Sequence, residues 1–155
     1  MASLLAVDVG VRTGLASFGD DGRLRWYRSQ NFGNAARLRR ALPGLLAEPR
    51  DLTRIVLEGG GVLADAWEHE GERHGLDVVR VAAETWRPVF MLSREQRSGV
   101  QAKEVAGRLA RIVIAWSGAK RPTSLRHDAA EAILIGLWGV LQAGWLDALP
   151  PELVR

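Results

Sequence analysis

The hydrophobic pattern predicts strands in the first part of the chain. An almost unbroken apolar run over residues 3–10 is typical of a buried strand, and residues 13–19 form a second such run. Asp20-Asp21-Gly22 supplies the turn residues of a hairpin. Residues 23–32 alternate polar and bulky side chains, as a half-buried third strand would. The chain is therefore predicted to begin with three hairpin-connected strands.

Beyond residue 33 the pattern alternates between helices and strands. Four helices are predicted, over residues 34–47, 63–74, 101–116 and 125–146. Strands are predicted over residues 53–58 and 77–82. Pro43-Gly44 should interrupt or end the first helix, because proline lacks the backbone N–H that a helix interior needs. This order predicts an α/β protein with a five-stranded mixed sheet flanked by helices, in a single domain over residues 1–155.

Composition excludes several classes of protein. With 155 residues, 47% hydrophobic and 25% charged, the chain is expected to form a globular domain and not a disordered one. The absence of cysteine excludes disulfides and thiolate metal sites. Residues 132–141 are wholly apolar but fall short of the roughly 20 residues that span a membrane, so a buried helix or subunit contact is expected there. Met1-Ala2-Ser3 carries no leader signal, which predicts a cytoplasmic protein without a membrane anchor.

Four carboxylates stand at positions that suggest a shared site. Asp8 interrupts the apolar first strand, where an ionised carboxylate costs several kcal/mol unless a cation or hydrogen bonds offset it. Glu58 closes the strand 53–58, and Asp128 and Glu131 share one face at the start of the last helix. Oxygen-only ligands are those that Mg²⁺ or Mn²⁺ prefers. Two such ions about 4 Å apart would suit phosphodiester hydrolysis.

Positive charge is concentrated in one part of the chain. Residues 87–126 hold nine Lys or Arg residues against only Glu95 and Glu104, a net charge of +7 within a chain whose total is +3. A basic block between two acid-bearing parts favours a polyanion held over a metal site.

The motifs around these acids resemble those of the RuvC-type Holliday-junction resolvases of the ribonuclease H-like superfamily. Residues 8–14, Asp-Val-Gly-Val-Arg-Thr-Gly, are similar to that family's Asp-x-Gly-x-x-x-Gly opening. The strand-terminal Glu58 matches its second acid, and residues 128–132, Asp-Ala-Ala-Glu-Ala, are similar to the start of its last helix, with Glu131 where aspartate is usual. The resemblance implies that Asp8, Glu58, Asp128 and Glu131 bind two Mg²⁺ or Mn²⁺ ions and carry out DNA cleavage at four-way junctions, in a homodimer.

The position of the second acid separates related families. Ribonuclease H enzymes carry it on the first helix, but the corresponding segment 34–47 contains no acid, whereas Glu58 ends a clear strand. The chain also departs from well-studied bacterial resolvases. These have an aromatic wedge shortly after the second acid, where this chain has Gly59-Gly60-Gly61.

Basic residues near the acidic motifs are candidates for binding branched DNA through its phosphates. The candidate set is Arg12, Arg87, Arg94, Arg97, Lys103, Lys120 and Arg126. The resemblance favours Arg87 most, because resolvases of this kind carry a basic residue after the fifth strand. His127 is expected to be a surface helix residue, although it adjoins Asp128. Trp67 and Trp86 are weaker candidates for stacking on bases.

Other functions remain open at this stage. A RuvX-like RNA-processing nuclease shares the Asp-x-Gly opening but is usually smaller. A ribonuclease H-type nuclease would share the chemistry, and a non-catalytic nucleic-acid-binding module would share the charge. Actin-like ATPases and sugar kinases also use Asp-x-Gly openings, but they need two such domains, and 155 residues supply only one.

Overall fold

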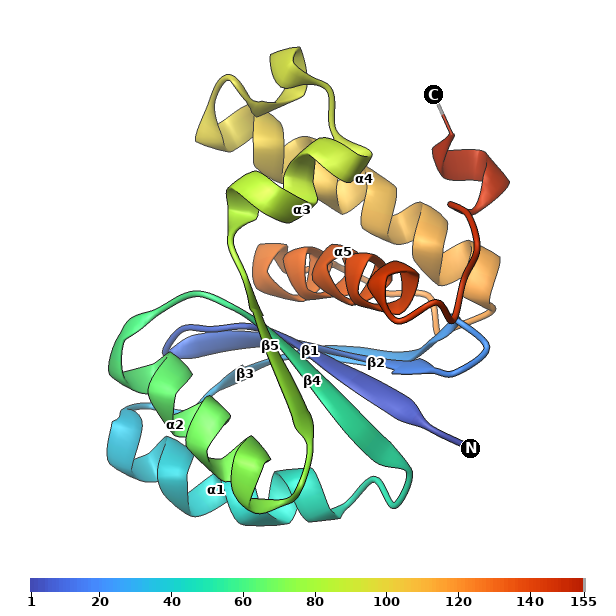
Figure 1. Cartoon of the computed structure of the whole chain (residues 1–155). Helices are drawn as coiled ribbons and strands as arrows, with labels where there is room; N and C mark the ends of the chain where they lie inside the picture. The colour runs from blue at the N-terminus through green and yellow to red at the C-terminus, as the bar shows by residue number, and fades with distance from the viewer. Residues whose placement is uncertain (155) are drawn as a thin grey trace.

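The computed structural model describes residues 1–154 and contains one five-stranded sheet in the order β3-β2-β1-β4-β5 (Figure 1). The strands are β1 (Ser3–Asp8), β2 (Arg12–Gly19), β3 (Leu24–Asn31), β4 (Leu52–Glu58) and β5 (Asp77–Val81). β1, β2 and β3 pair antiparallel, and β4 and β5 run parallel to β1. The predicted five-stranded mixed sheet is confirmed, with β1 at its centre.

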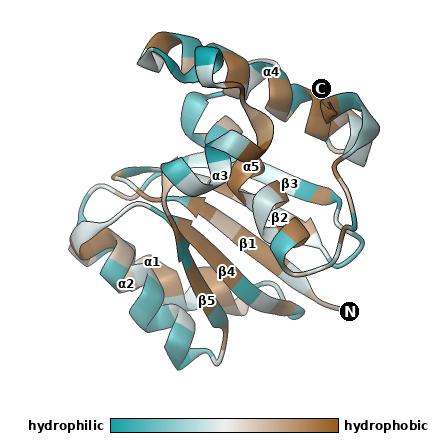
Figure 2. Cartoon of the chain, turned by 45° about the horizontal axis from the view of Figure 1, so that its top comes forward, coloured by the Kyte–Doolittle hydropathy of each residue, from teal (hydrophilic) through white to brown (hydrophobic). Residues whose placement is uncertain are grey.

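Helices cover both faces of the sheet. The α-helices are α1 (Ala35–Ala47), α2 (Gly61–Arg73), α3 (Ala83–Phe90), α4 (Gly99–Ser117) and α5 (His127–Gln142), and short 3₁₀ helices are η1 (Ser93–Gln96) and η2 (Pro151–Leu153). α1 and α2 lie on one face, while α5 lies directly on the other and α4 packs over α5 (Figure 1). Figure 2 shows that the apolar strands β1 and β4 run between these layers.

Two details of the predicted helices are wrong, the interruption at Pro43 and the end of the last helix. α1 continues through Pro43, because burial of Leu42 and Leu46 against the sheet offsets a proline cost of about 3 kcal/mol. α5 ends at Gln142 instead of residue 146, since Gly144 adopts a φ of 76° and Trp145 N–H returns to the Val140 carbonyl.

The prediction also missed one helix. α3 has only eight residues and contains Pro88, so its sequence carries little periodicity. It forms because Trp86 and Phe90, four residues apart, both bury against the core.

α5 is buried almost all round, as a helix between a sheet and a second helix must be. Gly136 permits the close approach to the sheet, because an added Cβ would lie 2.3 Å from the Phe18 ring. The predicted buried helix is confirmed. Residues 129–137 are already buried within the chain, so only the C-terminal part of this helix is left for the predicted subunit contact. No helix among residues 1–154 is long and apolar enough to cross a membrane.

Candidate metal centre

The sheet places Asp8 and Glu58 beside each other. They are the last residues of β1 and β4, and the parallel register makes them direct partners. Val9 N–H donates to the Glu58 carbonyl at 2.9 Å and so extends the pairing past both acids. Gly59 follows with a φ of 127°, and an added Cβ there would lie 2.9 Å from the Val9 Cβ. The glycine therefore lets the chain turn tightly behind the acid pair.

The first turn of α5 brings Asp128 to the same end of the sheet, where β1 and β4 finish. Asp128 Oδ2 accepts a hydrogen bond from Ser29 Oγ on β3 at 2.8 Å, and its Oδ1 accepts one from the Ala129 N–H at 2.8 Å. Gly14, the β2 partner of Asp8, makes this packing possible. A Cβ at Gly14 would lie 1.9 Å from the Asp128 carbonyl oxygen, so a larger residue would displace the helix.

Glu131 is the most buried of the four acids, with 4% of its surface exposed. Its Oε1 accepts a hydrogen bond from Arg87 Nη2 at 2.9 Å and lies 3.2 Å from His127 Nε2. Its Oε2 is buried without a hydrogen-bond partner. A buried carboxylate oxygen without a partner carries an uncompensated desolvation cost, and a bound cation would remove it.

Burial and the crowding of carboxylates raise the pKa of two of them, Asp8 and Glu58. Burial, followed by repulsion from Glu58 and Glu131, raises the pKa of Asp8 to about 8. Burial also raises the pKa of Glu58, although Arg87 opposes the shift. Burial lowers the pKa of His127, and Lys103 adds to that effect while Glu131 opposes it. The acid cluster is thus electrostatically unfavourable by itself.

These donors fit a divalent cation. All four acids supply oxygen, and the partnerless Glu131 Oε2 together with the strongly raised Asp8 pKa marks a site short of positive charge. Within residues 1–154, no three His, Asp or Glu side chains already stand in metal-holding geometry. Asp8, Glu58, Asp128 and Glu131 are the residues that could hold the ion.

The predicted DNA-binding residues fall into three groups. Arg87, Lys103 and Arg126 lie near the carboxylates. Arg87 donates a hydrogen bond to Glu131, burial and the charge of Lys103 lower the pKa of His127, and Arg126 is the N-cap of α5. Arg12 begins β2 and is exposed, and Lys120 lies in the connection between α4 and α5.

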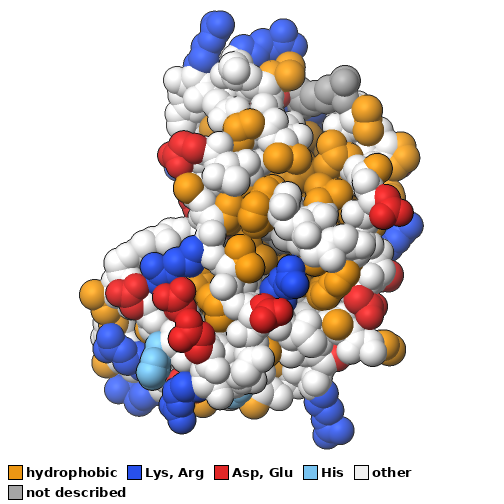
Figure 3. Space-filling view, in the orientation of Figure 1, with side chains coloured by type: hydrophobic (Ala, Val, Ile, Leu, Met, Phe, Trp, Pro, Cys, Tyr) orange, Lys and Arg blue, Asp and Glu red, His pale blue; other side chains and the backbone are white. Residues whose placement is uncertain are grey.

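The third group, Arg94 and Arg97, is exposed in the connection between α3 and α4. This connection stands away from the sheet (Figure 1), and basic side chains project from that end of the molecule (Figure 3).

Two side chains differ from their predicted surroundings, whereas His127 is an exposed helix residue as predicted. Trp67 and Trp86 are fully buried, so the suggestion that they stack on bases is wrong. Each packs against a phenylalanine, Trp67 against Phe32 and Trp86 against Phe90. His127 also contacts Glu131 and so belongs to the site.

Ser29 is a site residue that the sequence analysis missed. The only signal available was its place on a predicted strand, because its partner Asp128 is 99 positions away along the chain. The serine hydroxyl donates a hydrogen bond to Oδ2 of Asp128. The other carboxylate oxygen, Oδ1, accepts from the Ala129 N–H at the N-terminus of α5.

Substitution Ser29→Ala is expected to lower the cleavage rate about tenfold while leaving the fold intact, because outer hydrogen bonds that orient a metal ligand typically contribute 10–100-fold. The measurement is a Mg²⁺ titration of cleavage for both proteins. Ser29→Thr, which keeps the hydroxyl, should recover most of the loss. Equal Mg²⁺ dependence in the Ser29→Ala variant and the parent would contradict the assignment.

Comparison with solved structures shows the fold. The chain is similar to T. thermophilus RuvC in complex with Holliday junction substrate, with a TM-score of 0.66 and 14% identity over 93% of this chain and 96% of that chain. The catalytic domain of Mos1 mariner transposase aligns with a TM-score of only 0.35 and 14% identity, over 93% and 82% of the two chains, which is too low to support any argument.

No protein-family model matches the sequence, and no curated protein matches it. The similarity to the T. thermophilus RuvC structure and the strand order together show a ribonuclease H-like fold of the RuvC kind, as the motifs predicted.

Proposed function

We propose that the protein is a divalent-metal-dependent endonuclease that hydrolyses DNA phosphodiester bonds. The observation that carries the proposal is the meeting of Asp8, Glu58, Asp128 and Glu131 at one edge of the sheet, from β1, β4 and α5. Such a set of oxygen donors, with basic residues around it, suits a reaction in which negative charge develops on phosphate oxygens.

Each residue has a part in this chemistry. Two bound Mg²⁺ or Mn²⁺ ions would stabilise the attacking and leaving oxygens of the phosphodiester. The four carboxylates would hold the ions, and Ser29 orients Asp128. Arg87 holds Glu131 in place from one side, and its partly exposed guanidinium is also available to a phosphate. Lys103 and Arg126 add positive charge where the DNA backbone would approach.

We further propose that the substrate is a four-way DNA junction, cut by a homodimer. The fold is similar to that of T. thermophilus RuvC in complex with Holliday junction substrate. Paired symmetric cuts on a two-fold branched substrate favour two copies of one active site. Apolar side chains on the surface offer area for such an interface (Figure 3), among them the exposed Val62 on α2 and Val89 on α3.

The test is cleavage of labelled four-way junction, linear duplex, single-stranded DNA and RNA–DNA hybrid, each with Mg²⁺, with Mn²⁺ and with EDTA. We expect junction cleavage in both metals, none in EDTA, and at least about 100-fold slower cutting of linear duplex. This corresponds to about 2.7 kcal/mol of transition-state discrimination. Preferential cleavage of the hybrid would overturn the proposed junction substrate in favour of a ribonuclease H-type substrate. Failure to cut any substrate would overturn the nuclease proposal. Size-exclusion chromatography with light scattering tests the dimer.

A further inference from the structure

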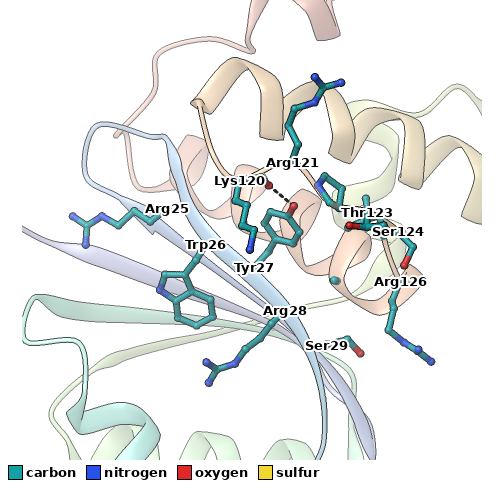
Figure 4. Close-up of a pocket in the computed structure, with 13 residues that line it drawn as sticks. Arg25, Trp26, Tyr27, Arg28, Ser29, Lys120, Arg121, Thr123, Ser124 and Arg126 are labelled. Carbon is teal, nitrogen blue, oxygen red and sulfur yellow. Dashed lines mark hydrogen bonds between the residues drawn. The ribbon is translucent and has the colours of Figure 1, made fainter.

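A groove runs along the outer edge of the sheet, and its basic residues include the C-terminal part of the basic block 87–126. It has a volume of about 530 Å³ and lies between β3, the last strand on its side of the sheet, and the connection from α4 to α5 (Figure 4). β3 contributes residues 25–29, and the connection contributes residues 120–126.

The groove is strongly positive. Five of its lining residues are basic and none is acidic. Arg25 is bound to Asp51 at 2.9 Å, but the other four make no ion pair in the part of the chain that the structure describes, and all four are exposed. These four are Arg28, Lys120, Arg121 and Arg126. Arg28 stacks over Trp26 on the α1/α2 side of β3, so the charge inside the groove comes from the connection between α4 and α5. Figure 4 shows the Lys120 side chain directed toward β3 and Arg121 pointing away from it. The groove therefore offers uncompensated charge to an anionic ligand.

The two walls of the groove are tied together. The Tyr27 hydroxyl on β3 donates a hydrogen bond to the Lys120 carbonyl, drawn as a dashed line in Figure 4. Nearby, Leu24 N–H donates to Ser117 Oγ at 3.0 Å, and Arg23 donates to the Trp116 carbonyl. A ligand would therefore enter a preformed site and would not have to order the loop first, which favours binding.

One end of the groove reaches the carboxylates. Ser29 lines the groove and at the same time holds Asp128 Oδ2 at 2.8 Å. Arg126 also lines it and directly precedes His127 and Asp128 on α5. A chain of phosphates that follows the groove from Lys120 would thus arrive at the candidate metal centre.

We propose that this groove binds a segment of single-stranded DNA and guides it to the carboxylates, with Lys120 and Arg126 on the phosphates. The proposal rests on the proposed nuclease function and adds the route of one strand. A volume of about 530 Å³ falls in the range of small-ligand pockets and is large enough for nucleotides of one strand. The exposed hydroxyls of Thr123 and Ser124 provide further donors along the same path.

An added peptide strand is the competing occupant, because β3 has an unpaired outer edge. The exposed Arg28 and the bound Arg25 on that edge argue against it, since charged side chains on an edge strand oppose pairing with another chain.

The experiment measures binding of fluorescein-labelled 15-nucleotide oligothymidylate by fluorescence anisotropy in EDTA. The double variant Lys120→Glu/Arg126→Glu is compared with the parent and with the control Arg39→Glu/Arg40→Glu, which makes the same charge change on α1 beyond the opposite face of the sheet. We expect roughly tenfold weaker binding for the groove variant, and a salt slope smaller by about 1.4 because two phosphate contacts are lost. The control should stay within about twofold of the parent, and thermal melts should show that both variants fold.

Equal affinities for the groove variant and the control would overturn the proposal, as would equal displacement of the label by polyglutamate or by duplex of the same length. The binding assay needs no metal and no cleavage. Binding that depends on the groove in a protein unable to cut any substrate would therefore retain the groove and reject the nuclease. Junction cleavage with groove-independent strand binding would do the reverse.

Discussion

Replacing Asp8 with asparagine is expected to lower the cleavage rate at least about 1000-fold, equivalent to about 4 kcal/mol of transition-state stabilisation. Asp8 lies at the centre of the sheet and interacts with Glu58, Glu131 and Asp128. The substitution keeps the size of the side chain but removes a charge that would help to bind a divalent cation. Binding of DNA should persist, because no basic residue is altered.

The measurement is single-turnover cleavage of the junction at saturating protein, with Asp147→Asn as the matched control. Asp147 is exposed and lies after the C-terminal end of α5, at the opposite end of that helix from Asp128. The control should cut at the parental rate. An Asp8→Asn variant that retains more than a tenth of the parental rate would remove Asp8 from the catalytic centre.

The second large effect concerns stability without metal. The folded protein holds the Asp8 proton up to a pKa of about 8, against 3.8 for an ordinary aspartate, because burial and the neighbouring acids disfavour the ionised form. The folded state thus binds more protons than the unfolded state between these two values. The free energy of unfolding should therefore fall as pH rises from about 4 to about 8, by up to about 1.4 kcal/mol per pH unit, and then level off. Glu58, whose pKa is also raised, acts in the same direction.

Urea unfolding at pH 5, 6.5 and 8 in EDTA measures this slope. Asp8→Asn should flatten it and be at least about 2 kcal/mol more stable than the parent at pH 8. Mg²⁺ or Mn²⁺ should stabilise the parent more at pH 8 than at pH 5, because a cation binds the ionised acids and competes with protons. The same metals should have little effect on Asp8→Asn. A parent protein whose stability in EDTA is independent of pH over this range would contradict the proposed burial of the acid cluster.

Both expected effects come from the clustering of four carboxylates. A site that collects four carboxylates is costly to the fold when it holds no cation, and the same collection is what a metal-dependent reaction requires. The cost is clearest at Glu131. Arg87 and His127 both contact its Oε1, and its Oε2 is buried without a hydrogen-bond partner. Variants of this cluster that are more stable without metal are therefore expected to bind metal more weakly.

The sequence by itself determined the sheet, four of its five α-helices and the identity of the acids. Strand and helix periodicities are local signals, and Asp8 within an apolar strand is conspicuous because an ionised buried acid is costly. α3 escaped detection because eight residues around Pro88 form a helix only when Trp86 and Phe90 find the core.

Only the tertiary structure decided which groups meet. The strand register sets Asp8 against Glu58, and Ser29 reaches Asp128 across 99 positions of chain. Packing also turned Trp86 inward and brought Lys120 beside β3 to form the groove. The physical reason is that these contacts depend on the sheet register and on the close approach of α5 over Gly14 and Gly136, which no local pattern in the sequence encodes.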